Sequence, residues 1–373
     1  MYAEVLIEYN NKAIDKTFTY KIPIFLKDDL KVGMKVQVPF GQKVINGFVT
    51  KITNEYNDSY QLKEIVNIVD KYLVLNEEML KLGTFLQQKT LCTKIAAYQT
   101  MLPSSLKVKT QNTEYAKYLY YIELNKPKEE ILNYISTYPR RKKQIEILNS
   151  LLEQGKILKS NYTSTQLANL IEDELIKVTK EQIYRSSTKE ATEFAPSLTT
   201  DQQNAINQVI LNQEKTYLLH GVTGSGKTEV YMQLIAKTLK NNQTAIMLVP
   251  EISLTTQIIN RFYNRFGSSV AIFHSALSDG EKYDEYLKIL RDEVKIVIGT
   301  RSAIFTPIKN LGLIIIDEEH SETYKQDTTP RYHALDMAKF RSHYNNIPLI
   351  LGSATPSFES MARAKKGVYE YIS

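Results

Sequence analysis

Short apolar runs separated by polar residues open the chain and predict strands there. Within each run apolar and polar positions alternate, and Gly, Asn or Asp stand between the runs, which is typical of antiparallel β-structure. The runs are AEVLIEY (3–9), TFTYKI (17–22), KVQVPFG (35–41), GFVTKI (47–52) and KEIVNIV (63–69). A helical pattern over 76–102 then reaches Pro103. We therefore expect a small β-rich domain over 1–104 that is closed by helices.

The pattern changes to polar, Lys-rich helical spacing over 105–195. Helices are expected over 113–124, 128–137, 141–155 and 163–176. The third of them has apolar residues at helical spacing, and Gly155 stands where a C-terminal cap would lie. Two interpretations of this α-rich region stay open: a winged-helix-like domain with 175–186 as the wing, or a plain helical linker domain.

Nearly unbroken apolar runs, separated by amphipathic helices, occupy the chain from 196 onward. The runs are TYLLHG (216–221), TAIMLVP (244–250), VAIFH (270–274), VKIVIGT (294–300), LGLIIIDEEH (311–320) and IPLILGSATPS (347–357). A strand that is buried on both faces has no polar face, so these runs predict a parallel α/β sheet. The expected architecture is multidomain, with an α/β lobe over 196–373.

Length and composition limit the number of domains, the kind of partner and the cellular compartment. A chain of 373 residues exceeds one ordinary core and suits two or three domains. The net charge of +6 favours polyanionic partners, although a mild lysine excess is also typical of a solvated surface. Cys92 is the only cysteine, which excludes an internal disulfide and a cysteine-rich zinc cluster in these residues. No run approaches the length of a membrane-spanning helix, so we expect a soluble cytoplasmic protein without a membrane partner.

A glycine-rich loop follows the first apolar run of the α/β lobe. Its sequence GVTGSGKT fits the phosphate-cradling pattern G-x-x-x-x-G-K-[ST], where a β-carbon would block the turn and the approach of phosphate oxygens. The lysine supplies a cation for the β and γ phosphates, and the threonine offers a hydroxyl to Mg²⁺. The expected site for ATP and Mg²⁺ comprises Gly221, Gly224, Ser225, Gly226, Lys227 and Thr228.

Two adjacent acids follow the apolar run LIII (313–316). Asp317 there can hold Mg²⁺ through water, and Glu318 can orient an attacking water. Two acids at a strand end are weak evidence alone, but a phosphate loop in the same sheet favours hydrolysis of the nucleotide. We therefore expect Lys227, Asp317 and Glu318 to be catalytic.

Four segments of the α/β lobe resemble motifs of superfamily 2 helicases. DEEH (317–320) resembles the D-E-x-H box, and GSATPS (352–357) resembles the S-A-T motif. LVPEISLT (248–255) and IVIGTRSAIF (296–305) fall where that superfamily places its DNA-contacting motifs Ia and Ib. The resemblance implies a P-loop, RecA-like helicase lobe.

Individual residues of these motifs take roles from the resemblance. Thr300 and Arg301 follow a strand end and could hold a phosphodiester backbone. The implied coupling of nucleotide turnover to DNA falls on His320, Ser353 and Thr355.

The match narrows to the PriA family (primosomal protein N′) of bacterial replication-restart helicases. Similar segments are GVTGSGKTEVY, LVPEISLT, GTRSAIFTP, DEEHSETYKQ, PRYHALDMA and GSATPSFES, and near the N-terminus FTYKIP, GMKVQVPFG and LKEIVNIVD. The resemblance implies an ATP-dependent 3′-to-5′ DNA helicase that recognises abandoned replication forks and initiates primosome assembly. The implied partners are forked and single-stranded DNA, primosome and helicase-loader proteins and single-stranded DNA-binding protein, and the chain is expected to be a monomer.

The first domain of that family grips the 3′ end of a nascent strand. Its pocket would fall on Phe18, Gly41 and Lys63, with Phe18 stacking on the terminal base and Lys63 facing phosphate. Where the family commonly has Asp, this chain has Thr19, whose hydroxyl is a weaker partner for a terminal 3′-OH. Without the resemblance, a core aromatic and a turn glycine are the simpler interpretations of Phe18 and Gly41.

The segment TYKQDTTPRYHALD (323–336) resembles the aromatic-rich loop with which the family senses single-stranded DNA. Tyr324 and Tyr332 are expected to offer stacking faces, and Lys325 a cation. The family often has Arg where Leu335 stands, which removes one positive contact.

Two further polar segments have alternative interpretations. Gln202 matches the adenine-reading glutamine of the family, while Thr200 and Gln203 are expected to form a helix-capping box. The basic run PRRKKQ (139–144) is expected to be a solvated face, with a contact to duplex phosphates as the alternative.

The family's second helicase lobe and its zinc region, the expected place for Zn²⁺, would lie beyond Ser373. We therefore expect an N-terminal portion that binds ATP and DNA with little turnover. Two alternatives stay open: a fork-binding scaffold that acts without unwinding, and another superfamily 2 translocase.

Overall fold

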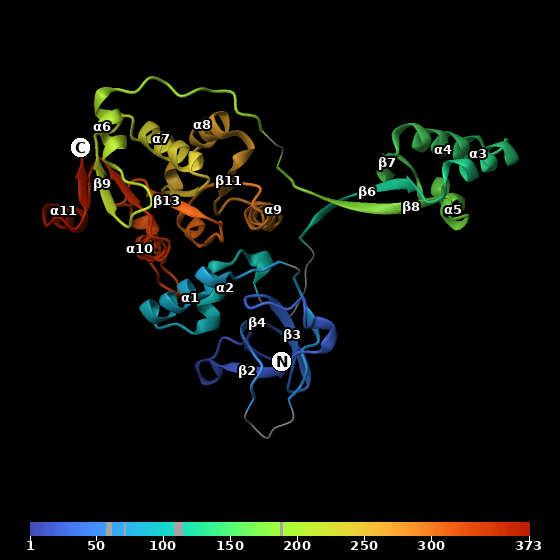
Figure 1. The fold of residues 1–373 in the computed structure, drawn as a ribbon, viewed down its shortest axis with the longest axis horizontal. Helices are drawn as coiled ribbons and strands as arrows, with labels where there is room; N and C mark the ends of the chain where they lie inside the picture. Colours follow the sequence, from blue (N-terminus) through green and yellow to red (C-terminus); the bar gives the residue numbers. More distant parts are fainter. Residues whose placement is uncertain (57–61, 71, 108–114, 187–188) are drawn as a thin grey trace. The chain divides into compact units, whose positions relative to one another are not determined.

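The computed structural model describes residues 1–56, 62–70, 72–107, 115–186 and 189–373 (Figure 1). They form two compact units. One comprises Met1–Glu114 with Ser187–Ser373, and the other comprises Tyr115–Ser186.

An antiparallel sheet forms the N-terminal part of the larger unit. Its strand order is β2-β1-β4-β3-β5. The strands are β1 (Tyr2–Ile7), β2 (Thr17–Lys21), β3 (Lys35–Phe40), β4 (Lys43–Thr53) and β5 (Asn67–Ile68). Because alternate residues such as Ala3, Val5 and Ile7 are buried, one sheet face packs on a core, and the predicted antiparallel β-structure is confirmed.

Two helices rather than one follow this sheet. Helix α1 (Glu77–Thr90) begins at the Asn76 cap and ends where Leu91 takes a left-handed conformation with φ of 54°. The Thr93 hydroxyl then accepts a hydrogen bond from the Ala96 N–H and starts α2 (Lys94–Met101). The continuous helical pattern over 76–102 is therefore interrupted by a second cap.

A seven-stranded parallel sheet forms the rest of the larger unit and confirms the predicted RecA-like α/β lobe. Its strand order is β11-β12-β10-β13-β14-β9-β15. The strands are β9 (Thr216–His220), β10 (Thr244–Leu248), β11 (Val270–Phe273), β12 (Ile296–Gly299), β13 (Leu311–Ile316), β14 (Leu349–Ser353) and β15 (Glu370–Ile372). The last strand pairs with β9 and is too short to stand out in the apolar pattern.

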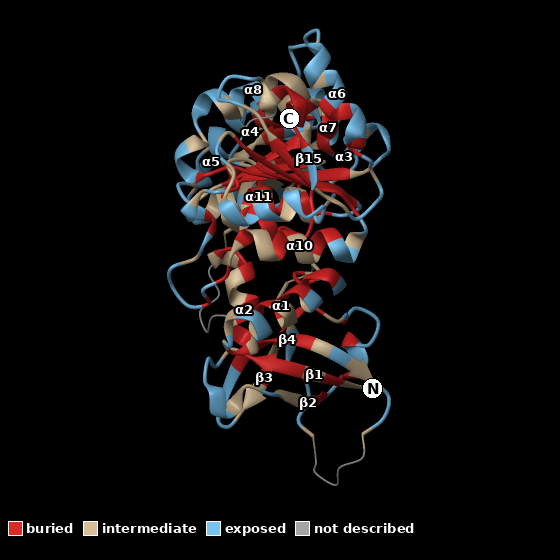
Figure 2. Cartoon of the chain, turned by 90° about the vertical axis from the view of Figure 1, so that its left-hand side faces the viewer, coloured by how far each residue is buried: buried red, intermediate tan, exposed pale blue. Residues whose placement is uncertain are grey.

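Helices cover both faces of this sheet, in which β10 to β14 are buried throughout (Figure 2). One face packs on α6 (Thr200–Gln208), α7 (Lys227–Lys240) and α8 (Thr256–Phe266). The other packs on α9 (Asp279–Leu290) and α10 (Ala334–Asn345), and its core continues into α1 and α2 of the N-terminal part. Helix α11 (Phe358–Lys365) follows β14. The N-terminal part and the α/β lobe thus share one hydrophobic core.

The smaller unit is a three-stranded antiparallel sheet of order β7-β6-β8 with helices packed on it. Its elements are β6 (Lys117–Leu124), α3 (Lys128–Thr137), α4 (Lys142–Gln154), β7 (Lys156–Leu158), α5 (Ser164–Glu172) and β8 (Ile176–Ile183). The helix predicted over 113–124 is wrong for its described residues, because β6 pairs along its whole length with β8. Its run of Tyr, Leu and Ile suits a pleated surface better than a helix. The winged-helix interpretation remains a prediction.

Candidate functional site

Three neighbouring strands end at the expected nucleotide-binding residues. Strand β14 lies between β9 and β13. Strand β9 leads into the phosphate loop, β13 leads into Asp317, and β14 ends at Ser353. The Gly221 N–H donates to the Ser353 carbonyl oxygen at 3.2 Å, and the Glu319 N–H donates to that of Gly352 at 3.0 Å. The fold therefore brings the phosphate loop, the D-E-x-H segment and the S-A-T segment to one edge of the sheet.

The phosphate loop has the backbone of an anion cradle. Gly224 and Gly226 have φ of 82° and 84°, which side chains with a β-carbon rarely adopt. Gly226 caps α7 without any side-chain hydrogen bond, so the first N–H groups of that helix face the loop. The Lys227 ammonium donates to the Gly221 carbonyl oxygen at 2.7 Å. Backbone and cation together fit a phosphate group.

Gln202 is fixed against this loop, and the expected capping box is shifted by one residue. Helix α6 is capped by Thr199, whose hydroxyl accepts from the Gln202 N–H, and the Gln202 side chain accepts from the Thr199 N–H at 3.0 Å. The pair Thr200 and Gln203 does not form the box, because the helix begins one residue earlier. The Gln202 Nε2 donates to the Ser225 carbonyl oxygen at 3.4 Å, and a β-carbon on Gly226 would lie 2.2 Å from it. One glutamine therefore caps the helix and contacts the phosphate loop.

Asp317 is largely buried, and Tyr231 is its partner. The Tyr231 hydroxyl donates to Asp317 Oδ1 at 2.9 Å. Burial raises the pKa of Asp317 above its ordinary value, and the hydrogen bond from Tyr231 opposes that rise. Burial and the neighbouring Asp317 also raise the pKa of Tyr231, which stays a neutral donor. The carboxylate is thus held in one orientation by a fully buried phenol.

The expected coupling residues form a connected chain. His320 Nδ1 and Ser353 Oγ are 2.8 Å apart, and the Thr355 N–H donates to the same hydroxyl at 3.0 Å. Glu318 has φ of 45°, and its Oε2 lies 3.7 Å from His320 Nδ1. A movement of the acidic loop, residues 317–320, would therefore change the contacts of the S-A-T segment.

Sequence reasoning missed Tyr231 and Glu319. Tyr231 stands one helical turn after Thr228, so it faces the same sheet edge, a spacing that could have identified it. Buried Glu319 accepts hydrogen bonds from the Ser357 N–H at 2.7 Å and the Ser360 hydroxyl at 2.9 Å. It therefore anchors the start of α11 to the acidic loop.

A magnesium ion at this edge would have few protein ligands. Within the described ranges, no group of three or more His, Cys, Asp or Glu could hold a metal. Thr228 and Asp317 remain the expected contacts. This fits Mg²⁺, which keeps several waters and binds through one or two protein groups together with substrate phosphates.

The turn after β12 carries the expected DNA-contacting pair. The Thr300 N–H donates to the Phe273 carbonyl oxygen at 3.1 Å. Arg301 Nη1 donates to the carbonyl oxygen of Thr323 at 3.1 Å and also to that of Lys325. The guanidinium is therefore tied to the segment expected to be the aromatic-rich loop.

The two tyrosines of that segment do not offer stacking faces in this structure. Tyr324 and Tyr332 are only 1% and 3% exposed. The Tyr324 hydroxyl donates to the Asp317 carbonyl oxygen at 2.5 Å. The Tyr332 ring packs edge-on against Phe305 at 4.9 Å, and burial raises the pKa of its hydroxyl to about 12. Packing against Phe305 and the hydrogen bond to Asp317 keep the two tyrosines buried. Lys325, the third residue expected to contact DNA in this segment, is exposed.

The residues expected to form the 3′-end pocket lie near one another on the antiparallel sheet. The Lys63 ammonium donates to the Gly41 carbonyl oxygen at 3.2 Å. Half-buried Phe18 packs edge-on against Phe40, with ring centroids 5.1 Å apart. Thr19 pairs in register with Glu4 on the neighbouring strand.

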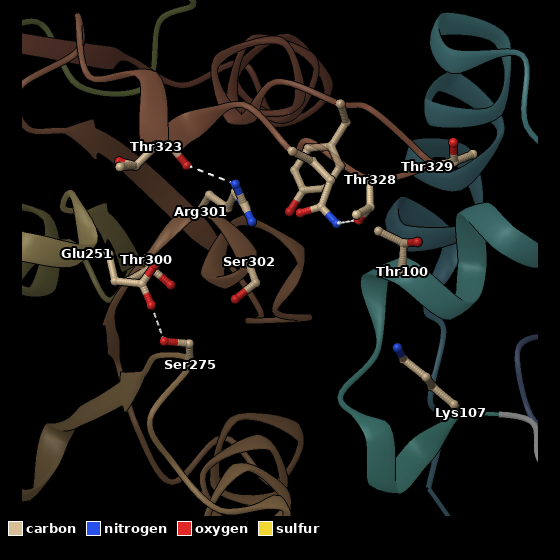
Figure 3. A pocket seen from close by; sticks show the side chains of 12 residues that line it. Thr100, Lys107, Glu251, Ser275, Thr300, Arg301, Ser302, Thr323, Thr328 and Thr329 are labelled. Atoms are coloured by element: carbon tan, nitrogen blue, oxygen red, sulfur yellow. Dashed lines mark hydrogen bonds between the residues drawn. The ribbon is translucent and has the colours of Figure 1, made fainter.

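A polar cavity of about 390 Å³ lies beside the Thr300–Arg301 turn (Figure 3). Seven of its lining residues carry hydroxyls on Ser or Thr, and Lys107 and Arg301 contribute positive charge. The shape and chemistry suit a polar ligand.

The basic run 139–144 lies in the smaller unit. Arg141 pairs with Asp173 at 3.4 Å and stacks over the Tyr138 ring. The pair is exposed, so the solvated-face interpretation and the phosphate-contact alternative both stay open. Among the residues that the structure describes, no helix is long and apolar enough to cross a membrane.

Comparisons with protein families match two regions of the chain. Residues 199–364 match the DEAD/DEAH box helicase family, and residues 4–103 match the 3′DNA-binding domain (3′BD). The unmatched interval includes the whole smaller unit.

Comparisons with curated proteins find PriA proteins among the relatives that match the whole chain. Replication restart protein PriA of Bacillus subtilis is 40% identical over 100% of this chain and 55% of that protein. PriA of Chlamydia trachomatis is 34% identical over 99% of this chain and 51% of that protein. The resemblance expected from the sequence is confirmed, and the chain spans about half the length of these relatives.

Among solved structures, the UvsW helicase from bacteriophage T4 aligns with 50% of this chain and 63% of that chain. The sequence identity is 16% and the TM-score 0.36. A likeness this low carries no weight beside the sequence relatives.

Proposed function

Along its whole length this chain is a relative of the PriA replication restart proteins, and from that premise we propose that it is the nucleotide- and DNA-binding portion of an ATP-dependent 3′-to-5′ DNA helicase. Its task is to recognise abandoned replication forks and their 3′ ends and to initiate primosome assembly in the bacterial cytoplasm. The observation that carries this proposal is the convergence of the phosphate loop, Asp317 and Ser353 at one sheet edge.

Each residue at that edge has one proposed role toward ATP. The Lys227 ammonium leaves the Gly221 carbonyl oxygen and binds the β and γ phosphates. Thr228 and Asp317 hold Mg²⁺, which neutralises charge on the phosphates. Glu318 orients the attacking water, and Gln202, already fixed by the phosphate loop, reads the adenine.

Turnover by these residues alone is proposed to be slow. The described residues contain one seven-stranded parallel sheet, and the relatives are about twice as long. A superfamily 2 motor closes two lobes on the nucleotide, and the second supplies arginines for the transferring phosphate. We propose that this lobe, and the zinc region, lie outside these 373 residues.

Steady-state ATP hydrolysis with and without forked DNA tests the proposal that these residues alone hydrolyse ATP slowly. We expect a rate close to that of the Lys227→Ala variant in both cases. Lys240→Ala, at the exposed end of the same helix, is the matched control and should behave like the unchanged protein. Robust stimulation by forked DNA that is lost only in Lys227→Ala would contradict the proposal of low turnover.

Fork recognition has its own test. A fork with a free 3′-OH should bind more tightly than the same fork ending in a 3′-phosphate, because Phe18, Gly41 and Lys63 form the proposed end pocket. Equal affinity for the two forks would count against the pocket while leaving the nucleotide site untouched.

A second candidate is a scaffold that marks fork ends and recruits helicase-loader proteins and single-stranded DNA-binding protein without unwinding. The exposed Lys63 and Gly41 beside Phe40 favour it, because end recognition there needs no nucleotide. Fork affinity that is the same with and without ATP would support this candidate, and affinity that changes with ATP would support the helicase. We propose that the chain acts as a monomer in either case.

A further inference from the structure

The cavity beside the Thr300–Arg301 turn has walls from two parts of the chain that are far apart in sequence. One wall is the turn itself with the segment 323–332, and the other carries Thr100 of α2 and Lys107. Figure 3 shows Arg301 and Ser302 on one side of the cavity and Thr100 and Lys107 on the other. Neither Thr100 nor Lys107 belongs to the D-E-x-H, S-A-T, Ia or Ib segments.

The lining chemistry suits a phosphodiester. The described lining residues include two cations, Lys107 and Arg301, and several hydroxyl donors. Glu251, in the same lining, accepts a hydrogen bond from Ser275. A guanidinium has five N–H donors, and two contacts from Arg301 Nη1 to backbone carbonyl oxygens hold the group against the wall of the cavity. Hydroxyls and cations without base-edge selectivity are typical of contacts to a nucleic-acid backbone.

The two walls are fixed to each other by a buried ion pair. Arg341 is completely buried, and it binds Glu78 of α1 through Nε at 2.7 Å and Nη2 at 3.0 Å. Its remaining nitrogen, Nη1, donates to the carbonyl oxygens of Ile304 and Thr306, at the end of the turn that begins with Arg301. Because helix α1 thereby holds that turn, the cavity is formed before any ligand binds, which lowers the entropy cost of binding.

We infer that Thr100 and Lys107 bind a backbone phosphate of single-stranded DNA, opposite Arg301 in this cavity. The inference rests on the proposed function for the identity of the ligand as DNA. It extends the DNA contacts of the α/β lobe to the helical end of the N-terminal part. A strand leaving the Thr300–Arg301 turn would then pass directly onto the N-terminal part.

Binding of an oligothymidine that ends in a 3′-phosphate tests the inference. The proposed 3′-end pocket prefers a free 3′-OH, so this end group reduces binding there. Lys107→Gln should weaken binding roughly 3- to 10-fold and reduce the dependence of log affinity on log salt by about one phosphate contact. Thr100→Ala should weaken it less, and Thr100→Ser should restore it because the hydroxyl returns. Lys27→Gln, an exposed lysine of the same part outside the cavity, is the matched control.

Pairing Lys107→Gln with Arg301→Gln tests whether the two cations share one phosphate. The double variant should lose less affinity than the product of the single losses. Wild-type salt dependence in Lys107→Gln, or an equal loss in Lys27→Gln, would overturn the inference. Millimolar inorganic phosphate or ATP that protects Lys107 from acetylation while the oligothymidine does not would also overturn it.

Failure of the inference and failure of the proposed function give different results. If the unchanged protein does not bind the oligothymidine at all, both are contradicted. If it binds and the two cavity variants bind equally well, only the inference fails. Thermal melting at the wild-type temperature shows that a variant is folded, and Thr100→Ser keeps the test valid if Thr100→Ala melts early.

Discussion

The nucleotide site and the proposed 3′-end pocket are built in opposite ways. At the nucleotide site, the ends of parallel strands, a buried phenol and a buried carboxylate interlock, so that Gly352 cannot accept even a β-carbon. At the 3′-end pocket, no described residue lies within 4 Å of the position of a β-carbon on Gly41, and the Lys63 ammonium donates to the Gly41 carbonyl oxygen. The first site is preorganised by packing, whereas the second is an open surface.

The two sites should therefore differ in how substitutions change stability and binding. A change at the nucleotide site disturbs stability and binding together, because the same contacts serve both. A change at the 3′-end pocket should alter binding with little loss of stability, since few contacts there are buried.

Gly352→Ala and Gly41→Ala are a matched pair for the contrast. A β-carbon at Gly352 would lie 1.6 Å from the Tyr231 hydroxyl oxygen. We expect Gly352→Ala to lower the free energy of unfolding by about 3 kcal/mol, the upper range of overpacking in a core. Gly41→Ala meets no atom but keeps φ of 60°, so it should cost roughly 1 kcal/mol. Urea denaturation measures both, and equal losses would contradict the contrast.

Tyr231→Phe removes the partner of Asp317 without adding volume. The loss of one hydrogen bond to a buried carboxylate should cost about 2 kcal/mol in urea denaturation. That hydrogen bond also lowers the pKa of Asp317, so the variant should need a higher pH for Mg²⁺-dependent ATP binding. A pH profile that coincides with that of the unchanged protein would argue against the assigned role of Tyr231.

Asp317→Asn should stabilise the protein near neutral pH while weakening Mg²⁺-dependent ATP binding. Burial raises the pKa of Asp317 in the folded state above its usual value of 3.8. The folded state therefore binds this proton more tightly than the unfolded state, so the ionised carboxylate costs stability once pH exceeds the folded pKa. Asparagine removes that cost. We expect the gain in the free energy of unfolding to be smaller than the losses expected for Gly352→Ala and Tyr231→Phe.

The pH dependence of this stability gain checks its origin. Well below pH 3.8 Asp317 is protonated in both states, and the gain of Asp317→Asn over the unchanged protein should vanish. Denaturation midpoints measured at pH 7 and at low pH separate this cause from a general packing effect. A gain of the same size at both values would contradict the electrostatic account.

Thr19→Asp restores the residue common in the family and should have the smallest effect on stability. Thr19 lies opposite Glu4 in the register of β1 and β2, and like charges at that position cost roughly 0.2 to 1 kcal/mol. We expect the preference for a free 3′-OH over a 3′-phosphate to rise roughly 3- to 10-fold, because a carboxylate is a stronger acceptor than a hydroxyl. Competition between the two forks measures it, and an unchanged preference would separate Thr19 from the end pocket.

The parallel sheet and its site were predictable because their signals are local. An unbroken apolar run predicts a strand buried on both faces, and parallel topology then brings the ends of β9, β13 and β14 together. The phosphate loop adds a fixed spacing of glycines and lysine that few other structures need.

The errors came from tertiary contacts and from one helix boundary. The strand β6 was predicted as a helix because its pairing with β8 lies across about sixty residues. Tyr324 and Tyr332 resemble an exposed aromatic loop, yet the backbone of Asp317 and the ring of Phe305 hold them in the core. The shift of the capping box to Thr199 is a one-residue error at a helix boundary, where sequence patterns are least informative.

The shared core between the N-terminal part and the α/β lobe has no sequence signature either. In the sequence, Arg341 and Glu78 are charged residues within helical patterns, where exposure is the usual expectation. The fold instead buries them together as an ion pair. Their pairing lies between two regions that have separate family matches and belong to a single compact unit.

Calorimetric titration with ATP in the presence of Mg²⁺ measures directly whether this sheet edge is a nucleotide site. We expect one binding event in the unchanged protein and in Lys240→Ala. In Lys227→Ala the affinity should fall roughly 10- to 100-fold, as expected for losing one charge-assisted contact. Absence of binding to the unchanged protein, or equal affinity in Lys227→Ala, would contradict a nucleotide site at this edge.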